Sequence, residues 1–212
     1  MEKIASQIGF WTSLFIATGG GIYSLIIIYS FSTEGFANPN TPLVQLAGGV
    51  VTFLSVPALV ILFTTIRFVN ETENKVFGSL GISFIVLFAA TVSINRFVQL
   101  TVIQQNLPDV PADLMRFLPY STDSVMFALE ILGWGFFSSL AAIFVAPLFS
   151  NSRLNKAIRW LFILYAMFSF MSVISFVAKT PIPTGPIAWG PILLAISILL
   201  SVYFRKINKQ IT

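Results

Sequence analysis

Six long apolar stretches dominate the chain, and short polar segments separate them. Each stretch holds at least the roughly 20 residues that an α-helix needs to cross the hydrocarbon core of a bilayer. The pattern therefore predicts an all-α, polytopic membrane protein with about six transmembrane helices in one bundle. The predicted helices lie at approximately residues 8–31, 43–66, 76–104, 122–149, 156–177 and 186–204.

The connections between these helices are too short to hold a separate soluble domain. The longest is the predicted outer loop at residues 105–121, which contains three prolines. The first apolar run exceeds the roughly 7–15 apolar residues of a signal peptide, and its flank pairs Glu2 with Lys3. We therefore interpret this run as a retained helix and residues 1–212 as a single transmembrane domain.

Composition supports an exterior that faces lipid. Apolar residues make up 56% of the chain and charged residues 9%, with a mean hydropathy of +0.88. Soluble domains carry about 25% charged residues, so this chain has too few charges to cover a surface that faces water.

Positive charges predict the orientation, because loops on the cytoplasmic side carry an excess of Lys and Arg. With the N-terminus inside, the outer side holds Arg116 and Lys179, while Arg96 lies within a helix. Both termini are then cytoplasmic, and we expect a multi-pass protein of a cell membrane, of the bacterial inner-membrane type. The cations on the inner side are Lys3, Arg67, Lys75, Arg153, Lys156, Arg159, Arg205, Lys206 and Lys209.

Several function classes are disfavoured by residues that the chain lacks. It contains no Cys and no His, which excludes disulfides, thiolate chemistry, His-ligated metals and His general bases. The net charge of +4 does not indicate nucleic-acid binding, because the cations lie at the ends of apolar stretches and form no patch. We expect no catalytic residues, no metal site and no cofactor, and hence no enzyme.

Two ionisable residues stand within predicted membrane helices, where charges are costly and are functional hypotheses by default. Arg96 lies eight residues before the predicted helix end at Gln104, and Glu130 lies eight residues after the predicted start at Thr122. At 1.5 Å per residue, both charges lie roughly 12 Å below the outer surface. Matching depth on consecutive antiparallel helices predicts an ion pair.

Polar neighbours extend this feature into a candidate pocket in the outer half of the bundle. Helical spacing places two amides beside the arginine, and it places an acid and a tryptophan on the stripe of the glutamate. We expect the outer loop to cover the pocket. The candidate ligand-binding residues are Arg96, Glu130, Asn95, Gln99, Asp123 and Trp134.

Tryptophans and glycines add two weaker expectations. Trp11, Trp160 and Trp189 fall near helix ends, as in the aromatic belts of membrane proteins, whereas Trp134 falls mid-helix. Gly21 follows Ala17 by four residues, a spacing typical of a helix-packing face.

Two main functional hypotheses remain open, with a proton-coupled role for Glu130 as a variant, and an intramembrane enzyme is the least favoured third. In the first, an integral membrane protein binds or transports a small solute, an ion or a lipid at the pocket around Arg96 and Glu130. In the second, the chain is a non-catalytic accessory or scaffold subunit, and the charged pair only fixes helix pairing. The expected partners are membrane lipids, a small-molecule or ion ligand, and a membrane-protein partner or a second copy of the chain.

Overall fold

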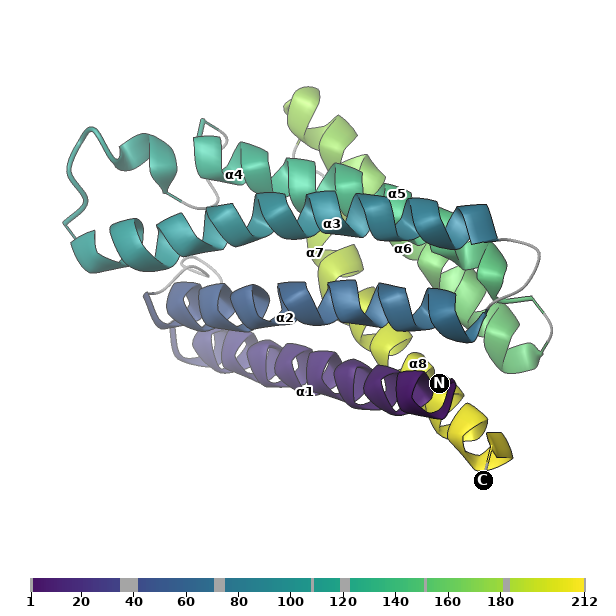
Figure 1. The fold of residues 1–212 in the computed structure, drawn as a ribbon. Helices are drawn as coiled ribbons and strands as arrows, with labels where there is room; N and C mark the ends of the chain where they lie inside the picture. The colour runs from purple at the N-terminus through teal and green to yellow at the C-terminus, as the bar shows by residue number, and fades with distance from the viewer. Residues whose placement is uncertain are drawn as a thin grey trace.

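The computed structural model describes residues 2–34, 42–70, 75–107, 109–118, 123–150, 152–180 and 184–211. Helices account for most of these ranges, and no β-strand occurs in them (Figure 1). Within the described residues, six helices are long and apolar enough to cross a membrane. The predicted all-α architecture and the predicted number of long apolar helices are therefore confirmed.

The first three long helices contain the predicted apolar stretches and extend beyond them. They are α1 (Glu2–Glu34), α2 (Pro42–Val69) and α3 (Lys75–Val98). The third continues as a π-helix, η1 (Gln99–Ile103), and a 3-10 turn, η2 (Gln104–Asn106). Backbone hydrogen bonding continues into the polar flanks, so hydropathy locates each apolar run but not the ends of its helix.

Two of the last three long helices, the fourth and the sixth, contain irregular turns. The fourth comprises α4 (Val125–Glu130), the π-helix η4 (Ile131–Phe137), α5 (Ser138–Val145) and the 3-10 turn η5 (Ala146–Leu148). The fifth is α6 (Arg153–Val177). The sixth comprises α7 (Thr184–Ile187), the π-helix η6 (Ala188–Ile192) and α8 (Leu193–Ile211). Between the third and fourth lies the 3-10 turn η3 (Met115–Phe117).

Serine caps determine where two of these helices begin. The Ser124 hydroxyl accepts hydrogen bonds from the backbone N–H groups of Met126 and Phe127, at 3.1 and 3.2 Å. A side-chain acceptor of this kind satisfies N–H groups that the first helical turn leaves unpaired. The α4 helix therefore begins at Val125, later than the apolar pattern predicts. Ser152 caps α6 in the same way.

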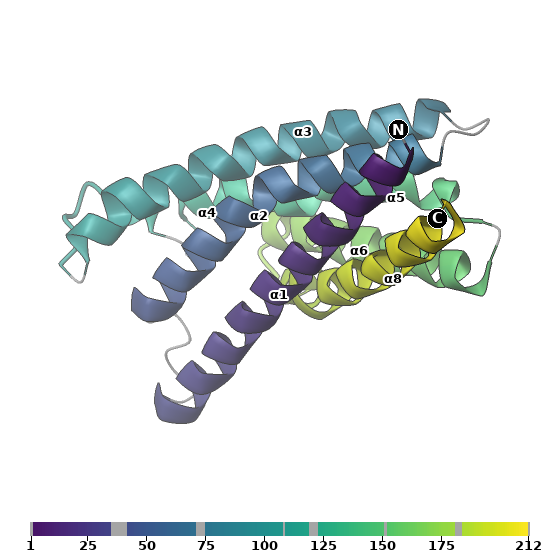
Figure 2. The same ribbon diagram turned by 60° about the horizontal axis from the view of Figure 1, so that its bottom comes forward.

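The long helices pack in a ring in which each contacts its neighbours in the sequence. The α1 helix packs on α2, α2 on α3, α3 on α5 and η4, and α5 on α6. The α6 helix also packs on α8, and α8 closes the ring against α1. The N- and C-termini consequently lie close together at one end of the bundle, where α1 and α8 run side by side (Figures 1 and 2).

An aromatic cluster joins α2, α6 and α8 with Phe149, which directly follows η5, in the half of the bundle near the termini. Phe162 of α6 lies 6.0 Å from Phe63 of α2 and 5.8 Å from Phe149, measured between ring centroids. Phe149 lies 5.4 Å from Tyr203 of α8, whose hydroxyl donates to Asn70 Oδ1 at 2.9 Å. Such aromatic pairs contribute about 0.5–1.5 kcal/mol each beyond the burial of their area.

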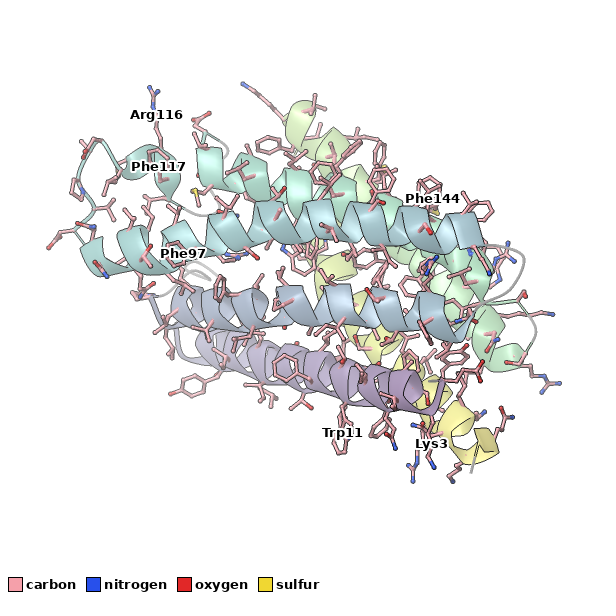
Figure 3. The ribbon with its side chains drawn as sticks, in the orientation of Figure 1. Lys3, Trp11, Phe97, Arg116, Phe117 and Phe144 are labelled. Atoms are coloured by element: carbon pink, nitrogen blue, oxygen red, sulfur yellow. The ribbon has the colours of Figure 1, made fainter. Side chains whose placement is uncertain are left out.

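The polarity of the two ends differs as the charge pattern predicts. The nine cations assigned to the inner side belong to helix ends or connections at the end where α1 begins. Lys3 lies at this end and Arg116 at the opposite one (Figure 3). The distribution satisfies the positive-inside rule for a chain with both termini on one side.

Among the described glycines of α1, Gly9 packs most closely against a neighbouring helix, whereas the sequence indicated Gly21. A Cβ atom built on Gly20 or Gly21 would meet no described atom within 4 Å, so Gly21 makes no close contact with another described helix of this chain. A Cβ on Gly9 would instead lie 2.5 Å from the ring of Phe204 on α8. Gly9 therefore permits the close approach of α1 and α8 that closes the ring.

We predict that Gly9→Leu lowers the unfolding free energy by about 1–3 kcal/mol, because the added side chain must displace the Phe204 ring. Gly20→Leu on the same helix is the matched control, and it should leave stability unchanged or slightly raised, because Leu favours a helix more than Gly does. The measurement is thermal unfolding of the purified variants in one detergent. Equal stability of the two variants would contradict the α1–α8 packing.

Candidate functional site

Arg96 and Glu130 form a buried ion pair between α3 and α4. The Arg96 Nη2 group donates to Glu130 Oε1. Each residue is only 5% exposed, so the two charges are removed from solvent and from the outer surface of the bundle. Mutual compensation is the condition under which charges are tolerated in such a place.

The pair forms although the helix ends are not level. Arg96 lies ten residues before the end of η2 at Asn106, and Glu130 lies five residues after the start of α4 at Val125. The third long helix therefore extends more residues beyond the ion pair, toward the connecting loop, than the fourth does. Equal spacing from the apolar ends nevertheless identified the right partners, because hydropathy tracks the apolar layer that both helices share.

Asn95 and Gln99 complete a hydrogen-bonded cluster around the pair. The Asn95 Nδ2 group donates to Glu130 Oε2 at 2.6 Å. The Arg96 Nη1 group donates to Gln99 Oε1. Both carboxylate oxygens of Glu130 thus accept a hydrogen bond, and the structure brings together four of the six candidate residues.

The Gln99 amide of this cluster keeps a donor without an acceptor in the described part of the chain. Gln99 is 3% exposed, and its Nε2 group makes no hydrogen bond there. The side chain is held from its other end, because Oε1 accepts from Arg96. Leaving a polar group of this kind buried and unpaired costs about 1–3 kcal/mol.

Trp134 lies one turn beyond Glu130, inside the π-helix η4. The backbone N–H of Ser138 bonds to Gly133 O, five residues back, instead of to Trp134 O. The Trp134 carbonyl accepts side-chain donors: the Ser138 hydroxyl and, at 3.2 Å, Trp189 Nε1. The widened turn therefore exposes a backbone acceptor in the interior of the bundle.

Trp189, partly buried near the start of the sixth long helix, directs its indole N–H into this site. Its indole N–H also lies 3.2 Å from Ser169 Oγ on α6, and its ring centroid lies 6.0 Å from that of Trp134. Pro191, two residues on, lacks a backbone N–H and falls within η6. Loss of that donor favours an irregular turn. Pro191 was therefore the feature of the sequence that could have indicated the irregular backbone at Trp189.

The polar interior continues from Trp134 toward α6. The Ser138 hydroxyl lies 2.9 Å from the Tyr165 hydroxyl. Tyr165 and Ser169 are buried and lie one turn apart on α6. The sequence does not mark these residues, because isolated hydroxyls within apolar runs are common and rarely indicate a site.

Two glycines of η4 allow the neighbouring helices to approach closely. A Cβ on Gly133 would lie 2.5 Å from Val92 Cγ2 of α3, and one on Gly135 would lie 2.6 Å from Val173 Cγ2 of α6. The expectation that the glycines beside Trp134 permit a close approach is confirmed. Trp134 itself is buried, and its ring centroid lies 4.7 Å from that of Phe88.

Asp123 and the charged side chains of the outer loop are exposed, although η3 of this loop packs on α4. Asp123 is exposed just before the cap of α4, and Asp109, Asp113 and Arg116 are exposed in the loop. The Arg116 side chain extends away from the bundle (Figure 3). The expected pocket residues thus separate into a buried group and an exposed acid.

The buried group has a definite chemical character. It holds one positive and one negative charge, two amides and an unfilled N–H donor at Gln99. Such a group can accept a ligand that offers a hydrogen-bond acceptor, and it can rearrange without a change in net charge.

Comparison of the chain with protein-family models, with curated proteins and with solved structures found no match.

We predict that Glu130→Leu lowers the unfolding free energy by about 3–5 kcal/mol, because Arg96 loses its counter-charge while it stays buried. The double variant Arg96→Met with Glu130→Leu should recover most of this loss. Asp123→Leu, which removes an exposed acid just before α4, is the control and should have little effect. The measurement is the fraction of monodisperse protein that remains after heating. Additive losses in the double variant would contradict coupling between the two charges.

Proposed function

We propose that this chain is a non-enzymatic multi-pass membrane protein that binds a small polar ligand at the cluster of Arg96, Glu130, Asn95 and Gln99. The helices that hold the cluster are long and apolar enough to cross a membrane. Both termini are proposed to be cytoplasmic, in agreement with the clustering of cations at their end of the bundle. Lipids surround the protein as partners.

The observation that carries the ligand proposal is the Gln99 amide. Its Nε2 group is buried, and no acceptor bonds to it in the described residues. Native proteins satisfy nearly all buried donors with protein groups, water or a ligand. A ligand with an acceptor oxygen, placed beside Gln99 and Arg96, would supply the missing partner.

The backbone around the cluster supports the same proposal. One π-helix begins at Gln99, a second begins directly after Glu130, and a third contains Trp189. Short π-helical segments within α-helices are rare and occur frequently at functional sites, because they reposition side chains and release carbonyl groups.

A scaffold subunit is the second candidate, and a specific observation favours it. The Arg96–Glu130 pair is buried, and protein donors reach both carboxylate oxygens. A pair of this kind would align α3 with α4 even if no ligand ever bound. In this case the chain would present its outer helix faces to a partner protein.

We predict that a small acceptor ligand raises the unfolding temperature of the wild-type protein and that Gln99→Met removes this shift. A ligand at 100 times its dissociation constant stabilises by about 2.7 kcal/mol. The probes are acetamide, acetate, inorganic phosphate and phosphatidylglycerol, each added to purified protein in a neutral detergent.

Gln105→Met is the matched control, because Gln105 is an exposed amide at the end of the same helix. It should keep the full shift. If no probe stabilises the wild-type protein, or if Gln99→Met responds like Gln105→Met, ligand binding at Gln99 is wrong and the scaffold candidate is preferred.

We predict opposite accessibility for cysteines placed at the two ends of the bundle. The chain has no native cysteine, so single substitutions can be labelled without background. Lys3→Cys and Lys209→Cys should react with a membrane-impermeant maleimide only in inverted membrane vesicles. Arg116→Cys and Lys179→Cys should react only in intact cells whose outer membrane or cell wall the maleimide can cross. Labelling of all four from one side would contradict the proposed topology.

A further inference from the structure

The charge balance of the buried cluster restricts what can bind there. Within the described ranges, Arg96 and Glu130 are the charged side chains that the structure buries, and they compensate each other. An anion that entered alone would leave one uncompensated negative charge in a medium of low dielectric constant. Such a charge is strongly disfavoured unless a proton or a cation accompanies it.

The donors of the cluster favour an anion as the ligand. Arg96 carries a planar guanidinium, which binds oxyanions through two parallel N–H groups. Gln99 lies directly beside it, since Gln99 Oε1 accepts from Arg96 Nη1, and it contributes the Nε2 donor that no described acceptor fills. An oxyanion at this place would take hydrogen bonds from both side chains.

Asn95 makes a change in the protonation of Glu130 structurally simple. In the charged state its Nδ2 group donates to Glu130 Oε2 at 2.6 Å. A protonated carboxyl has an O–H donor, and the carbonyl oxygen of an amide can accept it. Rotation of the Asn95 amide therefore satisfies Glu130 in either state, which an arginine or a lysine at position 95 would not do.

We propose that the cluster binds a small monovalent oxyanion together with one proton. This inference rests on the proposed function, and it names the ligand class and the coupling at the same site. The proton comes from solvent and forms an O–H bond on the Glu130 carboxylate. The ion pair with Arg96 breaks, and the Arg96 guanidinium and the Gln99 amide bind the anion. The cluster is neutral before and after the exchange, and no group is oxidised or reduced.

The surroundings of Glu130 assign the proton to this residue. The elements packed on α4 are α3, η3 and η4. The α3 helix contributes Arg96, while Asp113 and Arg116 at η3 are exposed, as is Asp123 before the cap. Tyr165 of α6, which packs on η4, is paired with the Ser138 hydroxyl. Glu130 is therefore the carboxylate that a proton reaches in this cluster, among the residues that the structure describes.

The experiment measures protons and anions together. Acetate is titrated into the purified, full-length wild-type protein in a neutral detergent and a weak buffer that contains a pH indicator. We expect one proton to be taken up per acetate bound, and the apparent affinity to fall about tenfold for each unit of rise in pH. Acetate binding without proton uptake would overturn the inference.

Two variants separate the roles of the charges. Glu130→Gln mimics the protonated carboxyl, so it should bind acetate without proton uptake and without dependence on pH. Arg96→Gln should lose acetate binding. Asp123→Asn, a change at an exposed acid, is the control and should behave like the wild type. A Glu130→Gln protein that keeps the pH dependence of the wild type would overturn the assignment to Glu130.

Further probes distinguish the source of the anion and the level at which a failure occurs. Phosphatidylglycerol in nanodiscs, compared with phosphatidylcholine, tests whether a lipid phosphodiester is the oxyanion instead of a soluble carboxylate. If acetamide stabilises the wild type without proton uptake and neither anion binds, the proposed ligand site stands and the coupling is wrong. If no probe binds, both proposals fail.

Discussion

The ion pair between Arg96 and Glu130 is the constraint around which the half of the bundle away from the termini is built. Two charges in an apolar interior are tolerated only in contact, so α3 and α4 must meet at these residues. Asn95 and Gln99 then occupy the remaining positions around the pair because they can donate to the carboxylate and accept from the guanidinium. The register of the third long helix against the fourth follows from this requirement.

The π-helical turns adapt the backbone to the same requirement. The turn that follows Glu130 shifts the hydrogen-bond ladder by one residue and exposes the Trp134 carbonyl. Ser138 and Trp189 supply the donors, and through them the cluster is connected to α6 and to the sixth long helix. The backbone acceptor that the π-turn frees is therefore satisfied by a hydrogen bond from another helix. This bond joins the fourth and the sixth long helices, which are far apart in the chain.

The contacts that hold the helices together differ between the two halves of the bundle. Near the termini, Gly9 accommodates Phe204, and an aromatic cluster fills the centre. In the other half, Gly133 and Gly135 bring α3 and α6 close to η4, beside the charged pair. In the first half aromatic packing is joined by the Tyr203–Asn70 hydrogen bond, whereas the second combines close packing with a buried charged pair.

The sequence by itself determined the number of long apolar helices, their approximate positions and the partners of the buried ion pair. These follow from local properties: the length of an apolar run, and the depth of a charge within it. Tertiary structure decided which residues surround the pair. The indole N–H of the partly buried Trp189, in the π-helix η6, reaches the Trp134 carbonyl, whereas Asp123 stays exposed just before the serine cap of α4. Tertiary structure also decided that Gly9, and not Gly21, packs closely against a described neighbouring helix. The reason is that the side chains of the neighbouring helix determine where a glycine is needed.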